Sequence, residues 1–310
     1  MVTTKREQRL RMVIDREQHM VSRSIMQDDD DFNFGEGADI TDMIEEDKVE
    51  ALVQRMGLIK EGLNYKTVES KRKNILAIDG GGIRVLIPMI ILMAIEEKTT
   101  RSIASMFTMF GGTSFGAFLI SALNKPRALR EWDYPKHTTL EVYKFFMDNL
   151  KSFFAPNPRI SDKKTGRPIP LKAKLMGEPL YNSKPMKRLL DVYFSEHRIN
   201  LLLNQLSIPA FEENSGTTFW FENDACDDAS DWPVSEVLLG AMASPTFFSS
   251  LEVPVDPYMP ASVAFEFTDG SIAWNNPAKH MVANAIADGA DLADVFVVSI
   301  GTGKTKMQGR

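Results

Sequence analysis

From residue 74 onwards, short apolar runs alternate with glycine-rich turns and longer apolar segments. The run Ile75 to Ile78 ends in the sequence DGGG, and a longer apolar segment, Val85 to Glu97, follows it. The same order recurs downstream, with a short run at 106–110, the turn GGTSFG, and a longer run at 117–123. Both units are typical of a strand, a glycine loop and a helix in succession.

The alternation continues in the second half of the chain. Apolar runs predict strands at 217–221, 265–268 and 295–300, and longer segments predict helices at 234–243 and 278–287. Short strands alternating with helices predict an α/β fold, a three-layer sandwich around a central, largely parallel sheet, over residues 71–310. Prolines punctuate residues 124–215, and the pattern assigns no element there.

Residues 1–70 differ from the rest and predict an N-terminal arm that is charged, partly helical and partly flexible. Ten acidic residues and no basic one fall within 28–47. Such a block cannot bury enough apolar surface to fold alone, so we expect 28–40 to be mobile or dependent on a partner. One docking helix is predicted beyond it, ending at Gly57, from apolar residues near helical spacing: Met43, Val49, Leu52, Val53 and Met56.

Composition excludes several classes of protein. The 310 residues carry 36 basic and 42 acidic side chains, a net charge of −6, which does not favour nucleic acid as a partner. The single cysteine, Cys226, excludes an internal disulfide and a multi-cysteine zinc site, and it favours a reducing compartment. The longest apolar run, Val85 to Ile95, is too short to cross a bilayer core of about 30 Å. We therefore expect a cytoplasmic protein, and the sequence indicates neither a metal nor a cofactor.

The turn Gly112-Thr113-Ser114-Phe115-Gly116 has the G-x-S-x-G pattern of a nucleophile elbow. A serine at a tight strand-to-helix turn exposes its hydroxyl above the sheet. Glycines two positions before and after it avoid collisions with the neighbouring strand and helix. The N-terminus of the following helix would favour negative charge on the serine oxygen. Five residues alone are weak evidence, because a glycine-rich turn can be purely structural.

The loop Gly80-Gly81-Gly82 supplies a context for that serine. Consecutive glycines between a strand and a helix leave backbone N–H groups uncovered, which suits a nucleotide phosphate or an oxyanion. The chain lacks both G-x-x-x-x-G-K-[ST] and a complete G-x-G-x-x-G, so an oxyanion hole is the better interpretation. Arg84 could stabilise this loop, form a structural salt bridge, or attract an anionic head group.

A serine nucleophile needs a base to take up its proton. None of the four histidines has a setting that marks a triad histidine, although His280 follows an acid in the order of α/β-hydrolases. Asp269 closes a predicted strand and precedes Gly270-Ser271, where a carboxylate could accept the serine proton directly. A Ser114–Asp269 dyad and a Ser114–Asp269–His280 triad therefore both remain open.

Taken in order, these motifs resemble the patatin-like phospholipase family over about residues 74 to 303. DGGGIR at 79–84 is similar to its oxyanion loop, GTSFG at 112–116 to its nucleophile elbow, and DGS at 269–271 to its aspartate motif. Four further stretches match in the same order: PLYNSKPMKRLL at 179–190, ASPTFF at 243–248, NNP at 275–277 and VVSIGTG at 297–303.

The resemblance implies a lipid acyl hydrolase of the phospholipase A or lysophospholipase type. Ser114 would be the nucleophile and Asp269 the base, cleaving acyl esters of phospholipid or lysophospholipid without histidine or calcium. The amides of Gly80, Gly81 and Gly82 would form the oxyanion hole. The stretch Asn275-Asn276-Pro277, with Asn276 as a supporting residue, is expected to cap the following helix and hold Asp269 in place rather than touch substrate.

Three departures from the family pattern qualify this. Val85 replaces a glycine that usually follows the arginine, Ser271 replaces a glycine or alanine, and the chain ends seven residues after Gly303. The first change could reshape the oxyanion loop, and the second should be tolerated. The third predicts closing elements that are missing or supplied by the N-terminal arm.

Partners are predicted from charge. Residues 151–188 carry ten basic and two acidic side chains next to Phe153-Phe154, which favours either peripheral docking on anionic phospholipid or a merely solvated loop. The acidic segment 28–47 is expected to contribute control by a protein or small-molecule activator. A catalytically weak homologue that serves as a binding scaffold is the alternative from a different class.

Overall fold

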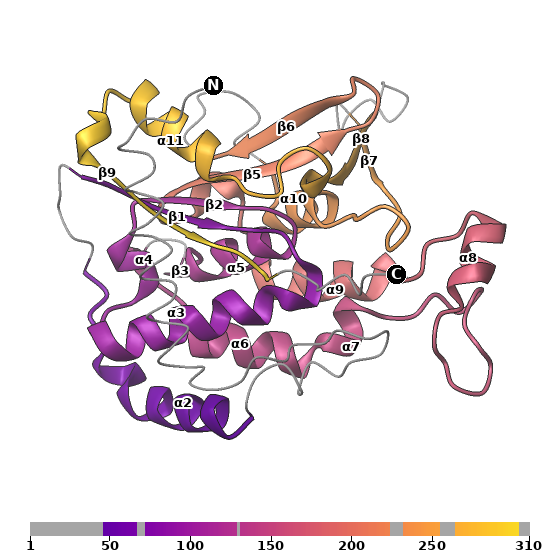
Figure 1. The fold of residues 1–310 in the computed structure, drawn as a ribbon, viewed down its shortest axis with the longest axis horizontal. Coiled ribbons are helices and arrows are strands. Elements are labelled where there is room, and N and C mark those ends of the chain that lie inside the picture. The colour runs from indigo at the N-terminus through magenta and orange to yellow at the C-terminus, as the bar shows by residue number, and fades with distance from the viewer. Residues whose placement is uncertain (1–45, 67–71, 129–130, 224–231, 255–263, 304–310) are drawn as a thin grey trace, which may run out of the picture.

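The computed structural model describes residues 46–66, 72–128, 131–223, 232–254 and 264–303. A seven-stranded sheet runs through the centre of the molecule (Figure 1), in the order β7-β8-β5-β2-β1-β9, with β6 paired to β5 outside this path. The strands are β1 (Lys73–Ile78), β2 (Met109–Gly112), β5 (Gln205–Glu212), β6 (Thr217–Glu222), β7 (Leu251–Pro254), β8 (Ala264–Asp269) and β9 (Val295–Ile300). A separate hairpin joins β3 (Pro126–Ala128) and β4 (Glu131–Pro135).

The sheet has a parallel part and an antiparallel part. Strands β9, β1, β2 and β5 are parallel neighbours. Strands β6 and β8 run antiparallel to β5, and β7 runs antiparallel to β8. The predicted α/β class is confirmed, with parallel strands limited to one side of a mixed sheet.

Strand β5 joins the two parts. Residues 205–207 of β5 pair with β2, and residues 210–212 pair with β8. Because β6 occupies the other edge along residues 207–212, β2 and β8 must share one edge of β5, where they meet end to end. Both strands finish at this meeting point, β2 at Gly112 and β8 at Asp269.

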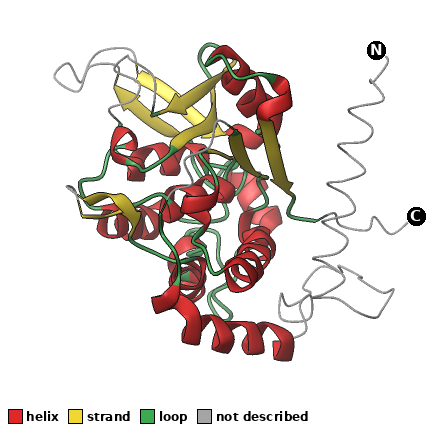
Figure 2. Cartoon of the chain, turned by 90° about the vertical axis from the view of Figure 1, so that its left-hand side faces the viewer, coloured by secondary structure: helices red, strands yellow, loops and turns green. Residues whose placement is uncertain are grey.

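Helices cover both faces of the sheet. Helix α11 (Ala278–Ala287) packs on β1 and β2 through Met281 and Ala285. Helices α5 and α10 cover the opposite face, and the remaining helices lie beyond them, so that most helices are on one side in Figure 2. Their bounds are α2 (Glu46–Ile59), α3 (Leu86–Thr99), α4 (Ile103–Met106), α5 (Phe115–Leu123), α6 (Thr139–Asp148), α7 (Leu150–Phe153), α8 (Pro170–Met176), α9 (Ser183–Phe194) and α10 (Val234–Ala241).

The main core lies between the sheet and this larger helical layer. It is rich in phenylalanine, and Phe118 of α5 makes ring contacts with Phe146, Phe153 and Phe194 at centroid distances of 6.1, 5.2 and 6.4 Å. Burying a large apolar side chain contributes about 1.5–3 kcal/mol. Helix α5, which follows the candidate serine, is therefore anchored by fully buried side chains.

Most predicted elements are confirmed, in both parts of the sheet. The strands predicted at 217–221, 265–268 and 295–300 correspond to β6, β8 and β9. The helix predicted at 278–287 has those bounds, and the helix predicted at 234–243 ends at Ala241. The strand predicted at 106–110 begins only at Met109, because residues 103–106 form α4. Gly57 does not end α2, which continues to Ile59 and packs on α3 and α6.

Other predictions were incomplete, or concern residues that the structure does not describe. The proline-rich segment 124–215, which received no assigned element, contains β5 and the helices α6 to α9. The acidic segment 28–40, Met43 and Cys226 lie outside the described residues. No helix in the described ranges has both the length and the apolar character required to span a membrane.

Candidate active site

Ser114 sits at a sharp turn between β2 and α5. Its backbone has φ 54° and ψ −127°, a conformation that side-chain-bearing residues rarely adopt. A Cβ on Gly112 would lie 2.6 Å from the carbonyl oxygen of Gly116, and a Cβ on Gly116 would lie 2.8 Å from that of Ile78. Only glycine fits both positions, so the strained turn that the G-x-S-x-G pattern predicted is present.

The Ser114 hydroxyl donates a hydrogen bond of 2.6 Å to Asp269 Oδ2. The second carboxylate oxygen, Oδ1, accepts the N–H of Ser271 at 2.9 Å. Ser114 is 4% exposed and Asp269 1% exposed. Burial raises the pKa of the Asp269 carboxyl, and the hydrogen bonds from Ser114 and Ser271 oppose this rise. The two residues singled out from the sequence are therefore brought into direct contact.

The backbone fixes Asp269 from two directions. Its N–H donates to the carbonyl oxygen of Ala243 at 3.1 Å, and the hydroxyl of Thr268 donates to the same oxygen at 2.7 Å. On the other side, Gly270 lies so close to β5 that a Cβ there would fall 2.2 Å from the Pro209 carbonyl oxygen. The ASPTFF stretch, which begins at Ala243, thus positions the end of β8.

The glycine loop lies beside the serine. A Cβ on Gly80 would be 3.2 Å from the Ser114 Cβ, and the Gly80 N–H donates to Asn275 O at 3.1 Å. No hydrogen bond to another described residue engages the amides of Gly81 and Gly82. Of the three amides predicted as oxyanion donors, these two can donate a hydrogen bond to a new acceptor.

Side chains brace this loop from outside. Arg84 donates from Nε to Gly81 O and from its guanidinium to Gly303 O, both at 3.4 Å. The Thr302 hydroxyl donates to Gly80 O at 2.9 Å. Arg84 thus stabilises the loop through backbone carbonyls, and its described contacts contain no structural salt bridge.

Asn276 supports a different carboxylate from the one expected. Its side-chain oxygen accepts the N–H of Ala278, the first residue of α11, at 2.9 Å, although the N-cap position itself is occupied by Pro277. Its amide, however, donates to Asp79 Oδ1 at 2.6 Å and to Ser299 Oγ at 2.8 Å, so the expectation that it holds Asp269 was wrong. The reason is topological, because Asn276 faces the ends of β1 and β9. Burial raises the pKa of Asp79, and the Asn276 hydrogen bond opposes that rise.

His280 is engaged away from the serine. Its Nε2 lies 2.8 Å from Glu222 Oε1, and its ring stacks on Trp220 at a centroid distance of 3.5 Å. Glu222 also accepts hydrogen bonds from Ser207 and Asn284. Asp269 contacts Ser114 directly with no imidazole between them. The triad arrangement considered from the sequence is therefore not formed.

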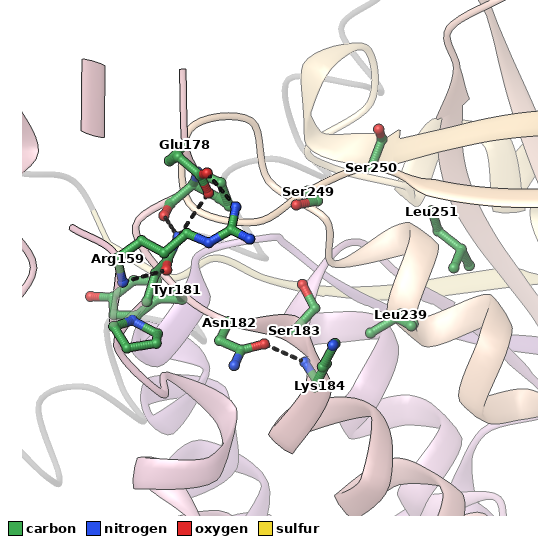
Figure 3. A pocket seen from close by; sticks show the side chains of 13 residues that line it. Arg159, Glu178, Tyr181, Asn182, Ser183, Lys184, Leu239, Ser249, Ser250 and Leu251 are labelled. Carbon is green, nitrogen blue, oxygen red and sulfur yellow. Dashed lines mark hydrogen bonds and ion pairs between the residues drawn. The ribbon is translucent and has the colours of Figure 1, made fainter. Parts of the chain in front are cut away.

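A cavity of about 420 Å³ opens next to this region (Figure 3). One wall is formed by residues 157–159, 178–179 and 181–184, and the other by Leu239 and residues 249–251. Ser114 is not among the lining residues. A ladder of rings connects the two places, from Phe115 to Phe154 at 5.1 Å and on to Tyr181 at 5.7 Å, and Tyr181 lines the cavity.

Within the described ranges, no group of three or more histidine, cysteine, aspartate or glutamate side chains could hold a metal ion. The chemistry that these residues can supply is that of a hydroxyl, a carboxylate and backbone amides. A strained serine, a buried carboxylate and a glycine loop at one rim of an α/β sheet form an arrangement suited to nucleophilic chemistry at the serine.

Comparison with known proteins places the chain in a family. The family model for patatin-like phospholipases matches residues 76–282, about two thirds of the chain. The chain belongs to the patatin-like phospholipase family, and the resemblance drawn from its motifs is confirmed.

Individual relatives agree with this assignment. Patatin-like protein 1 of Arabidopsis thaliana is 28% identical over 257 residues, covering 76% of this chain and 59% of the relative. A cGAMP-activated phospholipase of Escherichia coli (strain TW11681) is 25% identical over 255 residues, covering 77% of this chain and 64% of the relative. The chain thus spans about three fifths of the length of these curated relatives. The crystal structure of VipD from Legionella pneumophila gives a TM-score of 0.36 at 13% identity, over 76% of this chain and 52% of VipD, and this distant similarity supports no statement about the site.

Sequence reasoning missed several residues that hold the site together. The Thr113 hydroxyl donates to Trp274 O at 2.8 Å, and the Thr302 hydroxyl is fixed to the glycine loop. Both threonines are buried. A threonine beside a glycine at the end of an apolar strand was the available signal, since a buried hydroxyl requires a partner.

Proposed function

We propose that this chain is a lipid acyl hydrolase that cleaves carboxylic esters of phospholipids or lysophospholipids through a Ser114–Asp269 dyad. One observation carries the proposal: the 2.6 Å hydrogen bond between the Ser114 hydroxyl and a buried carboxylate whose pKa burial raises. A raised pKa makes Asp269 a stronger base closer to neutral pH. Family membership supports the lipid ester as the substrate class.

In the proposed first step, Asp269 Oδ2 takes the Ser114 proton while Oγ attacks the ester carbonyl carbon. The carbonyl oxygen becomes an oxyanion, which the amides of Gly81 and Gly82 stabilise. The N-terminus of α5, which starts at Phe115, adds partial positive charge at the same place. The tetrahedral intermediate collapses, the C–O bond breaks, and Asp269 returns the proton to the departing alcohol.

The second step releases the fatty acid. Asp269 takes a proton from water, the resulting hydroxide equivalent attacks the acyl-enzyme carbonyl, and the ester bond to Ser114 breaks. The proton passes back to Ser114 Oγ, which restores the starting state. The proposed role of Arg84 is to hold the loop that carries Gly81, through the carbonyls it contacts.

Three variants test the dyad on fluorogenic phospholipid vesicles and, in parallel, on a soluble short-chain ester. We expect Ser114→Ala and Asp269→Asn each to lower kcat by about 10³-fold or more, since each removes a group that acts as part of one unit. His280→Ala should leave the rate within about threefold, because its partners are Glu222 and Trp220.

Other outcomes identify the alternatives. Loss of activity in His280→Ala that matches Ser114→Ala would restore the triad. No Ser114-dependent hydrolysis of either substrate would favour the scaffold alternative. Because one relative is named a cGAMP-activated phospholipase, both assays include an arm with cGAMP, which tests the proposed small-molecule activator. Product analysis by mass spectrometry then distinguishes phospholipase A from lysophospholipase activity.

A further inference from the structure

Large apolar side chains are exposed in one short stretch around α8. Four of them lie within eight residues: Ile169 at 36%, Leu171 at 68%, Leu175 at 79% and Met176 at 51% exposed. Leu171 and Leu175 are four residues apart and therefore lie on the same side of the helix. An exposed apolar cluster of this kind marks an interaction surface rather than ordinary surface composition.

The stretch projects from the rest of the molecule. Figure 1 shows α8 at the far end of a long excursion, separated from the sheet and from the helices that cover it. The base of the excursion is closed by a bridge between Pro156 and Tyr181 and by a 2.9 Å hydrogen bond from Asn157 Nδ2 to Pro179 O. Arg159 and Glu178 add an ion pair of 2.8 Å at the same place. The apolar side chains are thus presented at the tip of a fixed projection.

The projection is positively charged in a chain that is negatively charged overall. Residues 159–178 contain six basic and two acidic side chains, a net charge of +4, whereas the whole chain carries −6. The cations precede the apolar residues and alternate with them: Lys163, Lys164 and Arg167 lie before α8, and Lys172 and Lys174 lie within it. Apolar side chains surrounded by lysine and arginine are suited to the interface of an anionic bilayer. The apolar side chains can be buried near the acyl chains, and the cations are attracted to the anionic head groups.

We propose that residues 163–176, here named the docking tip, bind an anionic phospholipid surface by inserting Leu171, Leu175 and Met176 among the lipid head groups. The proposal rests on the proposed function in that it names the surface from which the lipid substrate is taken. It also places the membrane contact at α8, whereas the sequence pattern associated it with Phe153-Phe154. Phe153 is fully buried and packs against Phe118, so it cannot supply the apolar part of a membrane contact.

The docking tip is connected to the candidate dyad through the backbone. The N–H groups of Leu180 and Tyr181, at the base of the projection, donate to Thr246 O and Phe247 O, each at 2.9 Å. Those acceptors lie three and four residues after Ala243, whose carbonyl holds Asp269. Docking at the tip would therefore fix the orientation of the site relative to the lipid surface.

The test is vesicle flotation of the full chain, with phosphatidylcholine vesicles and with vesicles that contain about 30% phosphatidylserine. The double variant Leu171→Ser/Leu175→Ser should lower binding to anionic vesicles by about tenfold or more. Lys163→Glu/Lys164→Glu/Lys174→Glu should remove the preference for anionic vesicles. The matched control is Leu58→Ser, because Leu58 is 85% exposed but belongs to α2, on the opposite side of the molecule in Figure 1.

The outcomes separate this proposal from the proposed function. Unchanged vesicle binding in the leucine double variant, or no vesicle binding by the wild type, overturns the docking tip. A second result would also overturn it: the wild type forms an oligomer in size-exclusion chromatography, and the double variant is monomeric but binds vesicles as before. That result would assign the surface to contact with a second copy of the chain. The double variant should keep hydrolysis of the soluble ester and lose hydrolysis of vesicle lipid. If vesicle binding behaves as expected while Ser114 proves dispensable for hydrolysis of both substrates, only the proposed function fails.

Discussion

The two parts of the sheet contribute to the site in different ways. In the parallel part, β1 and β2 each lead into a glycine loop and then a helix, so their contribution is a rigid backbone: the amides of Gly81 and Gly82 and the turn at Ser114. In the antiparallel part, β8 contributes one side chain, Asp269, at its last residue. The candidate site exists only because the ends of β2 and β8 meet on one edge of β5.

The two parts of the sheet therefore place different physical requirements on their residues. In the parallel part, Gly112 and Gly116 approach neighbouring backbone closely and tolerate little change, and Gly270 at the end of β8 has the same requirement. The antiparallel part requires a buried carboxylate, which costs free energy of folding because its charged form is poorly solvated. We expect substitutions in the first part to act mainly on stability, and substitutions in the second to exchange stability for activity.

The largest effect is expected at the nucleophile turn. In Gly116→Val, the new Cβ would lie 2.8 and 2.9 Å from the carbonyl oxygens of Ile78 and Asp79, which are backbone atoms of β1 and its loop. We expect the free energy of unfolding to fall by about 4 kcal/mol or more, measured by urea denaturation.

The matched control is a glycine in a helix with open space around it. A Cβ on Gly57 of α2 would have no neighbour within 4 Å. Gly57→Ala should therefore raise the free energy of unfolding, by up to about 1 kcal/mol, through better helix propensity. Equal destabilisation by the two variants would contradict the claim that the backbone around the nucleophile turn leaves no room for a side chain at Gly116.

The sequence predicted the parallel part well because its signals are local. A strand, a glycine loop and a helix are consecutive in the chain, and DGGG and GTSFG each announce a close backbone approach. Ser114 and Asp269 could both be singled out in this way, each from the end of its own apolar run.

Their meeting could not be predicted from local pattern, because it depends on β5. That strand contains Pro209 and lies in the proline-rich segment 124–215, which argued against a central strand. The structure explains why proline is tolerated there. Pro209 falls between residues 205–207, which pair with β2, and 210–212, which pair with β8, and its carbonyl faces Gly270 at that gap. The error over Asn276 has a similar cause. Its carboxylate partner is Asp79 and not Asp269, and this could not be predicted without the order of the strands.

The second largest effect on stability is expected at Glu96, a buried carboxylate in the helix that follows β1. It lies in α3, and its two oxygens accept the N–H groups of Ile103 and Thr139 at 3.1 and 3.0 Å. Burial raises its pKa from 4.5 to about 7. Because the folded state then holds a proton that the unfolded state has released, stability falls as the pH rises from 4.5 to 7, by about 3 kcal/mol from this group.

Glu96→Gln isolates that contribution. The free energy of unfolding of the wild type minus that of the variant should decrease between pH 4.5 and 7 and stay constant above it. Groups common to both proteins cancel in this difference. A difference that is independent of pH would mean that Glu96 does not titrate in this range.

Asp269→Asn tests the exchange of stability for activity in the antiparallel part. The folded-state pKa of Asp269 is raised, so its ionised form costs stability at neutral pH, and the loss grows as the pH rises through that pKa. An asparagine can still accept from Ser271 N–H and contact Ser114. We expect the variant to be inactive yet more stable by about 0.5–2 kcal/mol at neutral pH, with the gain disappearing in acid.

In the proposed mechanism, Asp269 also sets the pH dependence of the rate. The acid limb of kcat/KM for the soluble ester should lie above the ordinary aspartate pKa of about 3.9, because the base must be ionised to act. A limb at or below that value, or a variant less stable than the wild type at neutral pH, would show that Asp269 is a structural partner and not a destabilised base.

The smallest effect is expected at Arg84, and it separates two interpretations of one residue. Its two hydrogen bonds to Gly81 O and Gly303 O are long, 3.4 Å each, so Arg84→Ala should lower the free energy of unfolding by no more than about 1 kcal/mol. If Arg84 acts by holding the amides of Gly81 and Gly82 in place, kcat falls by about tenfold or less while KM stays constant, on soluble and vesicle substrates alike. If it binds an anionic head group, KM rises for anionic vesicles only. Arg84→Lys distinguishes the two interpretations further, because lysine keeps the positive charge but cannot form both hydrogen bonds of the guanidinium. A decrease in kcat equal to that of Arg84→Ala would assign the residue to support of the glycine loop.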